Sequence, residues 1–159
     1  MKKDKFAFLI LHNIRSAHNV GSLFRTADAV GVSKLFLTGY TPAPIDRFGR
    51  PRKDISKVAL GAEQTVLWEH VKNISTLIKR LKNGHVHIIA LEQARGAVDY
   101  RKLKVGKHFA LVLGNEVTGI SKTILDQCDM VAQIPMRGKK ESLNVAVAGG
   151  IALFQLFGV

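Results

Sequence analysis

Polar residues follow apolar runs at three places in the C-terminal third of the chain. Residues 114–116 (Gly-Asn-Glu) come directly after the apolar run 108–113, and residues 134–136 (Ile-Pro-Met) end the next run. Residues 142–144 (Ser-Leu-Asn) precede a final apolar segment. Open α/β sheets bind ligands where loops leave the carboxyl ends of their strands. This third of the chain is therefore predicted to hold a cofactor.

A second candidate is Arg25, in a helix that the sequence predicts from about residue 20 to residue 30. Residues of that helix form an apolar stripe at three- and four-residue intervals, and Arg25 falls outside the stripe. Taken alone, Arg25 fits the exposed face of an amphipathic helix. It also fits a fixed cation that stabilises negative charge developing on a reacting group. Asn19 is predicted to cap this helix, and Gly31 is predicted to end it.

The elements that must position these residues alternate between strand and helix. Continuous apolar runs predict strands that are covered on both faces, at 6–11, 34–38, 85–91, 108–113 and 130–134. Helical spacing predicts helices at 20–30, 71–82, 121–127 and 142–156. A short helix is expected in 57–64, a strand at 65–68, and a long surface loop at 39–56. This order predicts an α/β fold with a mostly parallel sheet.

Composition limits the possible partners. The chain of 159 residues carries 24 Lys and Arg against 12 Asp and Glu, a net charge of +12, which favours nucleic acid over an anionic membrane. Its one cysteine fits a reducing cytoplasm. The N-terminal apolar run is too short for a signal peptide or a membrane span. Scattered histidines and a single cysteine make a metal site unexpected, and dinucleotide and phosphate-loop motifs are absent.

Three segments together resemble the motifs of the SpoU (TrmH-type) RNA ribose 2′-O-methyltransferases of the SPOUT superfamily. Residues 19–31, residues 113–119, and residues 134–136 with 141–146 resemble the first, second and third motif, in the family's order and near its spacing. The resemblance covers nearly the whole chain. It implies a single SPOUT domain over residues 1–159, an α/β fold with helices on both faces of the sheet, and a deep trefoil knot at about 108–159. It also implies S-adenosylmethionine as cofactor and a homodimer.

The resemblance also assigns roles to individual residues. The nucleophile would be a ribose hydroxyl, which is almost wholly protonated at neutral pH, so the site must help to deprotonate it or stabilise the alkoxide. By resemblance Arg25 is the catalytic arginine. Because guanidinium holds its proton far above neutral pH, we prefer a fixed cation beside the alkoxide, or a clamp on the neighbouring phosphate, to a general base. Asn19, Glu116, Ser142 and Asn144 are the other candidate catalytic residues, and helix capping remains an alternative for each.

Cofactor contacts are expected mainly from the main chain, because peptide N–H and C=O groups can read the edge of an adenine. Gly114, Ile134 and Leu143 match the family's binding positions. Asn115 belongs to the same turn, and Leu91 and Met136 are candidate pocket walls. Ordinary core packing remains an alternative for Leu91.

RNA contacts are expected from basic residues in three places, where they would track phosphates with little sequence choice. These candidates are Arg15, Arg47, Arg50, Arg52, Lys53, Arg137, Lys139 and Lys140. Phe48 is a candidate for stacking on an unpaired base. A solvated charged surface is the alternative.

Two rival functions stay open: a SPOUT methyltransferase acting on a base nitrogen, and a non-catalytic RNA-binding module of the same fold. The final helix is apolar on most sides, which favours a second copy as its cover. Compared with ribosomal-RNA members and tRNA guanosine members, the chain is expected to lack appended domains and long flanking helices. The choice between tRNA and rRNA is left open.

Overall fold

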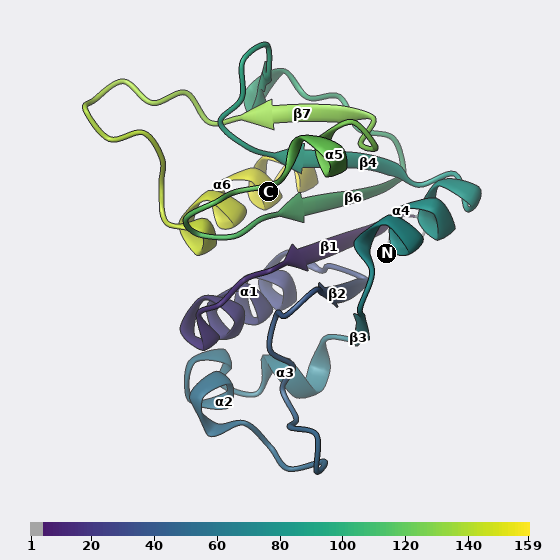
Figure 1. Ribbon diagram of the computed structural model, residues 1–159, viewed down its shortest axis with the longest axis vertical. Coiled ribbons are helices and arrows are strands. Elements are labelled where there is room, and N and C mark those ends of the chain that lie inside the picture. The colour runs from purple at the N-terminus through teal and green to yellow at the C-terminus, as the bar shows by residue number, and fades with distance from the viewer. Residues whose placement is uncertain (1–4) are drawn as a thin grey trace.

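The computed structural model describes residues 5–159 (Figure 1). In this range seven strands form one sheet in the order β3-β2-β1-β6-β4-β7-β5, and every neighbouring pair is parallel. The strands are β1 (Phe6–His12), β2 (Lys34–Thr38), β3 (Trp68–Val71), β4 (His87–Leu91), β5 (Val98–Asp99), β6 (His108–Leu113) and β7 (Met130–Gln133). The predicted mostly parallel sheet is confirmed, and all its strands end at one edge.

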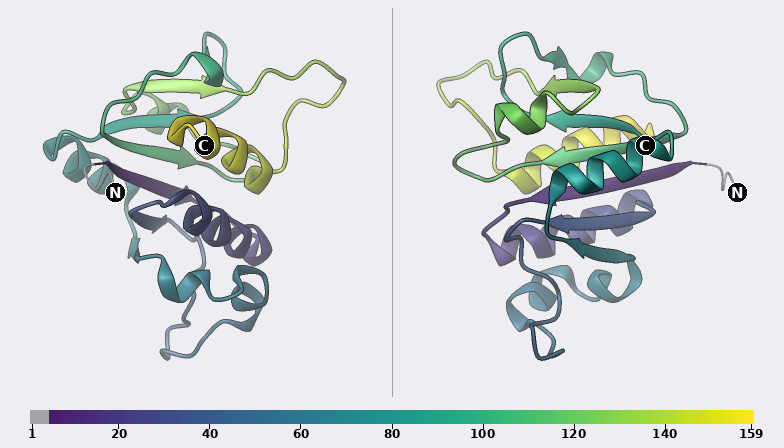
Figure 2. Two further views of the ribbon diagram at one scale, coloured as in Figure 1. Left: turned by 180° about the vertical axis from the view of Figure 1, so that it is seen from behind. Right: turned by 45° about the vertical axis from the view of Figure 1, so that its right-hand side comes forward.

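Helices cover both faces of this sheet, as predicted (Figures 1 and 2). They are α1 (Ala17–Val30), α2 (Lys53–Ala59), α3 (Ala62–Thr65), α4 (Ile74–Asn83), η1 (Tyr100–Lys102), α5 (Lys122–Leu125) and α6 (Val145–Phe157). Helices α1, α2, α3 and α6 pack with Leu9, Leu11 and Leu111 in one buried cluster. Helices α4 and α5 pack with Ile10, Ala110 and Val112 in the other. Successive side chains along β1 and β6 thus point alternately into two apolar layers, one on each face, as is typical of a parallel sheet covered on both sides.

Helix α1 begins earlier than predicted, which changes the role of Asn19. Ser16 is the N-cap, and its side chain accepts a hydrogen bond from the Asn19 backbone N–H at 3.1 Å. The predicted cap at Asn19 is therefore wrong, since Ser16 already satisfies the first turn. This frees the Asn19 side chain for other partners. Gly31 ends the helix in the left-handed region (φ 84°), as predicted.

The other differences between predicted and observed elements lie where the apolar pattern of the sequence is short. The expected helix in 57–64 is two shorter helices, α2 and α3, broken at Leu60 and Gly61, which both have positive φ. The strand expected at 65–68 is β3, three residues later, and α4 begins after it with Asn73 as its cap. Strand β5 has only two residues and was not predicted.

The last helix also starts later than predicted. Asn144 is its N-cap, so Ser142 and Leu143 lie outside the helix. Helix α6 packs against α1 through small residues: a Cβ added at Gly149 would lie 2.8 Å from Leu23 Cδ2, and one at Gly150 would lie 3.8 Å from Thr26 Cγ2. The trefoil knot stays a prediction.

Candidate active site

A groove lies at the carboxyl edge of β4, β6 and β7. It has about 660 Å³ of empty space, part of it open to solvent. Five of the six predicted cofactor-binding residues line it: Leu91, Gly114, Asn115, Ile134 and Leu143. Glu116 and Ser142 line it as well, so residues from all three loops of the C-terminal third meet at one place.

The loop after β6 is held in one shape by Asn115, whose side chain is buried. Its Oδ1 accepts hydrogen bonds from the backbone N–H groups of Val117 (2.8 Å) and Thr118 (2.9 Å), and its carbonyl accepts one from Gly119 N–H. The turn is tight: a Cβ at Gly114 would lie 2.8 Å from the backbone carbonyl carbon and oxygen of Gly119. Glycine is therefore required at residue 114 for steric reasons.

Glu116, Asn19 and Asn144 form a continuous polar relay beside the groove. Asn19 Nδ2 donates to Glu116 Oε1 at 3.2 Å, and Asn144 Nδ2 donates to Asn19 Oδ1 at 3.2 Å. Asn144 Oδ1 meanwhile caps α6 by accepting from Ala146 and Val147 N–H. The relay therefore joins the start of α1, the loop after β6 and the start of α6, which are far apart in sequence.

Glu116 also binds the N-terminal end of α1. Its two carboxylate oxygens accept hydrogen bonds from the backbone N–H groups of Arg15 (3.2 Å) and Ser16 (3.1 Å). Burial acts to raise the pKa of Glu116, but hydrogen bonds from its own backbone, Ser16, Arg15 and Asn19 outweigh burial and hold that pKa below its usual value. Glu116 is therefore a carboxylate at neutral pH, placed where the helix dipole favours an anion.

Two further groove residues, Glu92 and Gln93, escaped the sequence analysis. Glu92 Oε2 accepts from Ile120 N–H at 2.7 Å and also contacts the site where a Gly119 Cβ would be, so it fastens the loop after β6 to β4. Gln93 Nε2 donates to the carbonyl of Ile134 at 2.6 Å. Both directly follow a strand, and this is the signal that could have identified them.

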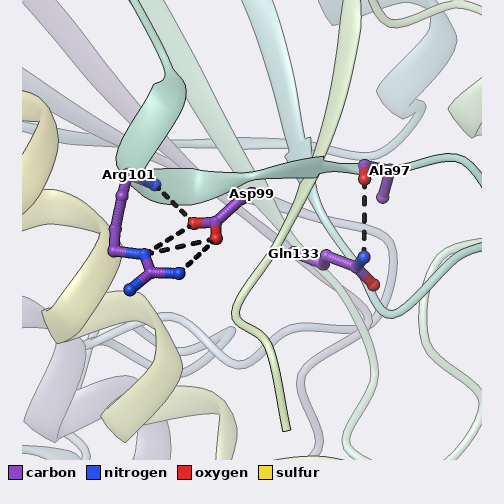
Figure 3. Close-up of polar contacts among 4 residues, drawn as sticks. All are labelled: Ala97, Asp99, Arg101 and Gln133. Carbon is purple, nitrogen blue, oxygen red and sulfur yellow. Dashed lines mark hydrogen bonds and ion pairs between the residues drawn. The ribbon is translucent and has the colours of Figure 1, made fainter.

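The outer wall of the groove is fastened to the edge strand β5. Figure 3 shows Gln133, the last residue of β7, donating from Nε2 to the carbonyl of Ala97 at 3.4 Å. Nearby, Arg101 binds the carboxylate of Asp99 through its guanidinium and its backbone N–H, and these bonds lower the pKa of Asp99 to about 2. Arg101 belongs to η1, and Asp99 is the N-cap of η1, so these bonds fasten η1 to the end of β5.

Four predicted catalytic or cofactor residues lie outside the groove lining. Two of them, Asn19 and Asn144, belong to the relay, and the other two, Arg25 and Met136, belong to neither. Arg25 is exposed on α1, and within residues 5–159 its side chain takes part in none of the side-chain hydrogen bonds or ion pairs of the structure. Met136 is half-buried on the segment after β7. The predicted RNA-binding residues are exposed, except for the half-buried Arg52. Arg50 and Arg52 pair with Asp46 and Asp54.

No group of three or more His, Cys, Asp or Glu side chains is placed to hold a metal ion in residues 5–159. Over the same range, no helix combines the length and the apolar character that crossing a membrane requires.

Known proteins resemble the chain over nearly its whole length. The model of the SpoU rRNA Methylase family matches residues 7–154. A Staphylococcus aureus (strain COL) protein named as a TrmH family tRNA/rRNA methyltransferase is 33% identical over 156 residues, which are 98% of this chain and 60% of that protein. The chain thus spans about 60% of the length of the curated relatives it matches.

Solved structures agree with this match. The TrmH/SpoU tRNA modifying enzyme of A. aeolicus has 31% identity and a TM-score of 0.80, covering 97% of this chain and 74% of that chain. The AdoMet-bound rRNA methyltransferase of Sinorhizobium meliloti has 29% identity and a TM-score of 0.83, covering 96% of this chain and 56% of that chain. The α/β fold, the joined motifs and a family match over most of the chain agree, and the chain belongs to the SpoU rRNA methylase family.

Proposed function

We propose that this chain transfers a methyl group from S-adenosylmethionine to the 2′-hydroxyl of a ribose in tRNA or rRNA. The observation that carries the proposal is the Glu116–Asn19–Asn144 relay at the side of the groove. A relay of one carboxylate and two amides offers fixed hydrogen-bonding groups that can orient a sugar hydroxyl. Family membership supports the reaction class, and the bound AdoMet of the Sinorhizobium meliloti relative supports the cofactor.

The lining of the groove suits S-adenosylmethionine in its chemistry. Apolar side chains such as Leu91 and Leu143 line the groove together with polar groups of Asn115 and Glu116. Gly114 lets the backbone approach closely, and the Ile134 carbonyl already accepts a hydrogen bond from the amide nitrogen of Gln93, as it would from an amino group of adenine. When bound there, the cofactor supplies an activated methyl group on sulfur.

The residues of the chain then have to orient the nucleophile and stabilise its charge. The ribose oxygen forms a bond to the methyl carbon as the carbon–sulfur bond breaks, and the hydroxyl proton passes to solvent. Glu116, ionised at neutral pH, fixes Asn19, and Asn19 with Asn144 positions the hydroxyl. Arg25 supplies a cation beside the developing alkoxide. A preorganised cation stabilises the negative charge that forms on the oxygen in the transition state.

A second copy of the chain completes the proposed active unit. Helix α6 carries an apolar stripe on the side away from the sheet, in which Val147 and Phe154 are 52% and 42% exposed and Ile151 is half-buried. The neighbouring Thr26 of α1 borders this stripe at Gly150, so a copy that covers the stripe also approaches the exposed side of α1 that carries Arg25. Sedimentation that finds a fully active monomer would contradict this arrangement. The cytoplasmic location stays a prediction.

The basic residues named in the sequence analysis would hold the RNA. Arg15 lies beside Glu116, and Arg137, Lys139 and Lys140 lie on the segment after β7, so positive charge flanks the groove on two sides. Phosphate contacts of this kind give affinity and orientation.

Transfer of labelled methyl groups to RNA from cells that lack the gene tests the proposal. Wild type is expected to label this RNA, and Arg25→Ala is expected to lose at least about a hundredfold in rate, in line with losses of a charge-stabilising group. Because Arg25 is exposed and unpaired in the described chain, the variant should keep the wild-type free energy of unfolding and affinity for S-adenosylmethionine. Full activity of Arg25→Ala would contradict the assigned role, and RNA binding without transfer would favour the non-catalytic module.

A further inference from the structure

Tyr40 lies at the carboxyl end of β2 and reaches across the end of β1 to the loop after β6. Its hydroxyl accepts a hydrogen bond from Asn115 Nδ2 at 3.0 Å, although β2 and β6 are separated by β1 in the sheet. The same Asn115 shapes the groove loop, and the next residue is Glu116. Tyr40 therefore touches the site from the side opposite β4 and β7.

The backbone at Tyr40 is fixed as firmly as its hydroxyl. Tyr40 N–H donates to Asn13 Oδ1 at 3.2 Å, and Asn13 itself adopts the left-handed region (φ 55°). The next residue, the buried Thr41, donates to the Leu11 carbonyl at 2.8 Å and accepts from Ile14 N–H at 3.0 Å. The ring is thus held at both ends before any ligand binds.

Core packing does not account for this ring, since Tyr40 is 58% exposed. Arg15, which follows β1 by three residues, is exposed too, and its backbone N–H donates a hydrogen bond to Glu116. An exposed aromatic residue and an exposed arginine thus both contact the loop after β6, Tyr40 at Asn115 and Arg15 at Glu116. Proteins recognise unpaired RNA with this combination, because bases stack on aromatic rings and phosphates bind arginine.

We propose that Tyr40 binds substrate, its ring stacking on an unpaired RNA base next to the ribose that is methylated. The inference rests on the proposed function. The cofactor groove lies over β4, β6 and β7, and the loop after β6 carries both Glu116 of the relay and Asn115, which binds Tyr40. A nucleotide whose ribose reaches the relay can therefore place its base, or the neighbouring base, over the ends of β1 and β2.

Two variants separate stacking from support of the loop. Tyr40→Phe and Tyr40→Leu both lose the bond to Asn115, but only phenylalanine keeps an aromatic face. With RNA from cells that lack the gene, we expect the RNA KM of Tyr40→Leu to exceed that of Tyr40→Phe by about tenfold, the scale of one base–aromatic stack. The Kd for S-adenosylmethionine should be equal in the two variants.

The matched control is Phe6→Leu, because Phe6 is 53% exposed at the opposite end of the sheet. Its RNA KM should equal that of wild type. Equal RNA KM values for Tyr40→Phe and Tyr40→Leu, with wild type active, would overturn the stacking role and leave the methyltransferase proposal intact. Wild type that transfers no methyl group to any RNA fraction would overturn both.

Discussion

The loop after β6 and the segment after β7 both border the groove, but they are held in very different ways. In residues 114–120 the Asn115 and Glu92 side chains bind the loop backbone, and Glu116 binds the start of α1. By contrast, residues 135–143 take part in none of the hydrogen bonds found in the described part of the chain. Figure 2 shows this segment extending away from the sheet before it returns to α6.

The difference indicates how the site is divided. The first loop carries Glu116 of the relay and the tight turn at Gly114. The proposed reaction requires both to be in place before the cofactor and the RNA bind. The second carries Arg137, Lys139 and Lys140, whose backbone and side chains are exposed. We expect the first loop to be preformed and the second to become ordered when cofactor and RNA bind, as for loops that close over substrates.

Gly114→Ala should produce the largest effect. The added Cβ would meet the Gly119 backbone, which cannot move without breaking the bonds of the loop. We expect the free energy of unfolding to fall by about 1–3 kcal/mol. Calorimetry should show S-adenosylmethionine binding weakened by at least about a hundredfold, because moving the loop backbone displaces its main-chain contacts with the cofactor.

Gly138→Ala is the control from the second segment. A Cβ there has no atom within 4 Å and its φ is not positive, so stability and cofactor affinity should match wild type. Equal loss in both variants would mean that the two loops do not differ as described.

Glu116→Ala should have the next largest effect. It removes an anion from the N-terminal end of α1, worth about 0.5–1 kcal/mol of stability, and leaves Asn19 without its acceptor. Methyl transfer is expected to fall at least about tenfold, as for loss of a positioning group. Glu141→Ala, an exposed acidic residue of the second segment, is the matched control. If both variants keep full activity, the relay is not required.

Asn144→Ser separates the two roles of that residue. Serine caps helices about as well as asparagine, whereas alanine costs about 1 kcal/mol. Neither can reach Asn19. Urea unfolding should therefore show a loss only for Asn144→Ala, while both variants should transfer methyl groups more slowly than wild type. A fully active Asn144→Ser would show that capping is the only role.

The smallest effect concerns pH. The pKa of Glu116 is lowered in the folded chain, so its contribution to stability is present above the unfolded value of 4.5 and is lost as the pH falls through the folded value. Melting temperatures of wild type and Glu116→Gln should therefore differ at pH 7 and converge in acid. A difference that persists below the folded pKa would contradict the assigned charge.

The sequence predicts those parts of the fold in which the pattern is long. Strands β1, β2 and β6 follow from apolar runs, and the location of the groove follows from the polar ends of the later runs. The individual residues Gly114, Ile134 and Leu143 follow from the resemblance to the SpoU family. The cap of α1 was misplaced because Ser16 and Asn19 are both good caps. In the structure the Ser16 side chain caps the helix, and the Asn19 side chain binds Glu116 instead. Strand β5 has two residues and no period to detect. Tyr40 looks like an ordinary loop residue until its bond to Asn115 is seen.

The position of the transferred methyl group tests the central claim most directly. RNA from cells that lack the gene is incubated with the protein and S-adenosylmethionine carrying a deuterated methyl group, digested to nucleosides and analysed by mass spectrometry. We predict the label on 2′-O-methyl nucleosides with wild type and its loss with Arg25→Ala and Glu116→Ala. Label on a base nitrogen, or S-adenosylmethionine binding without labelled RNA, would contradict the account.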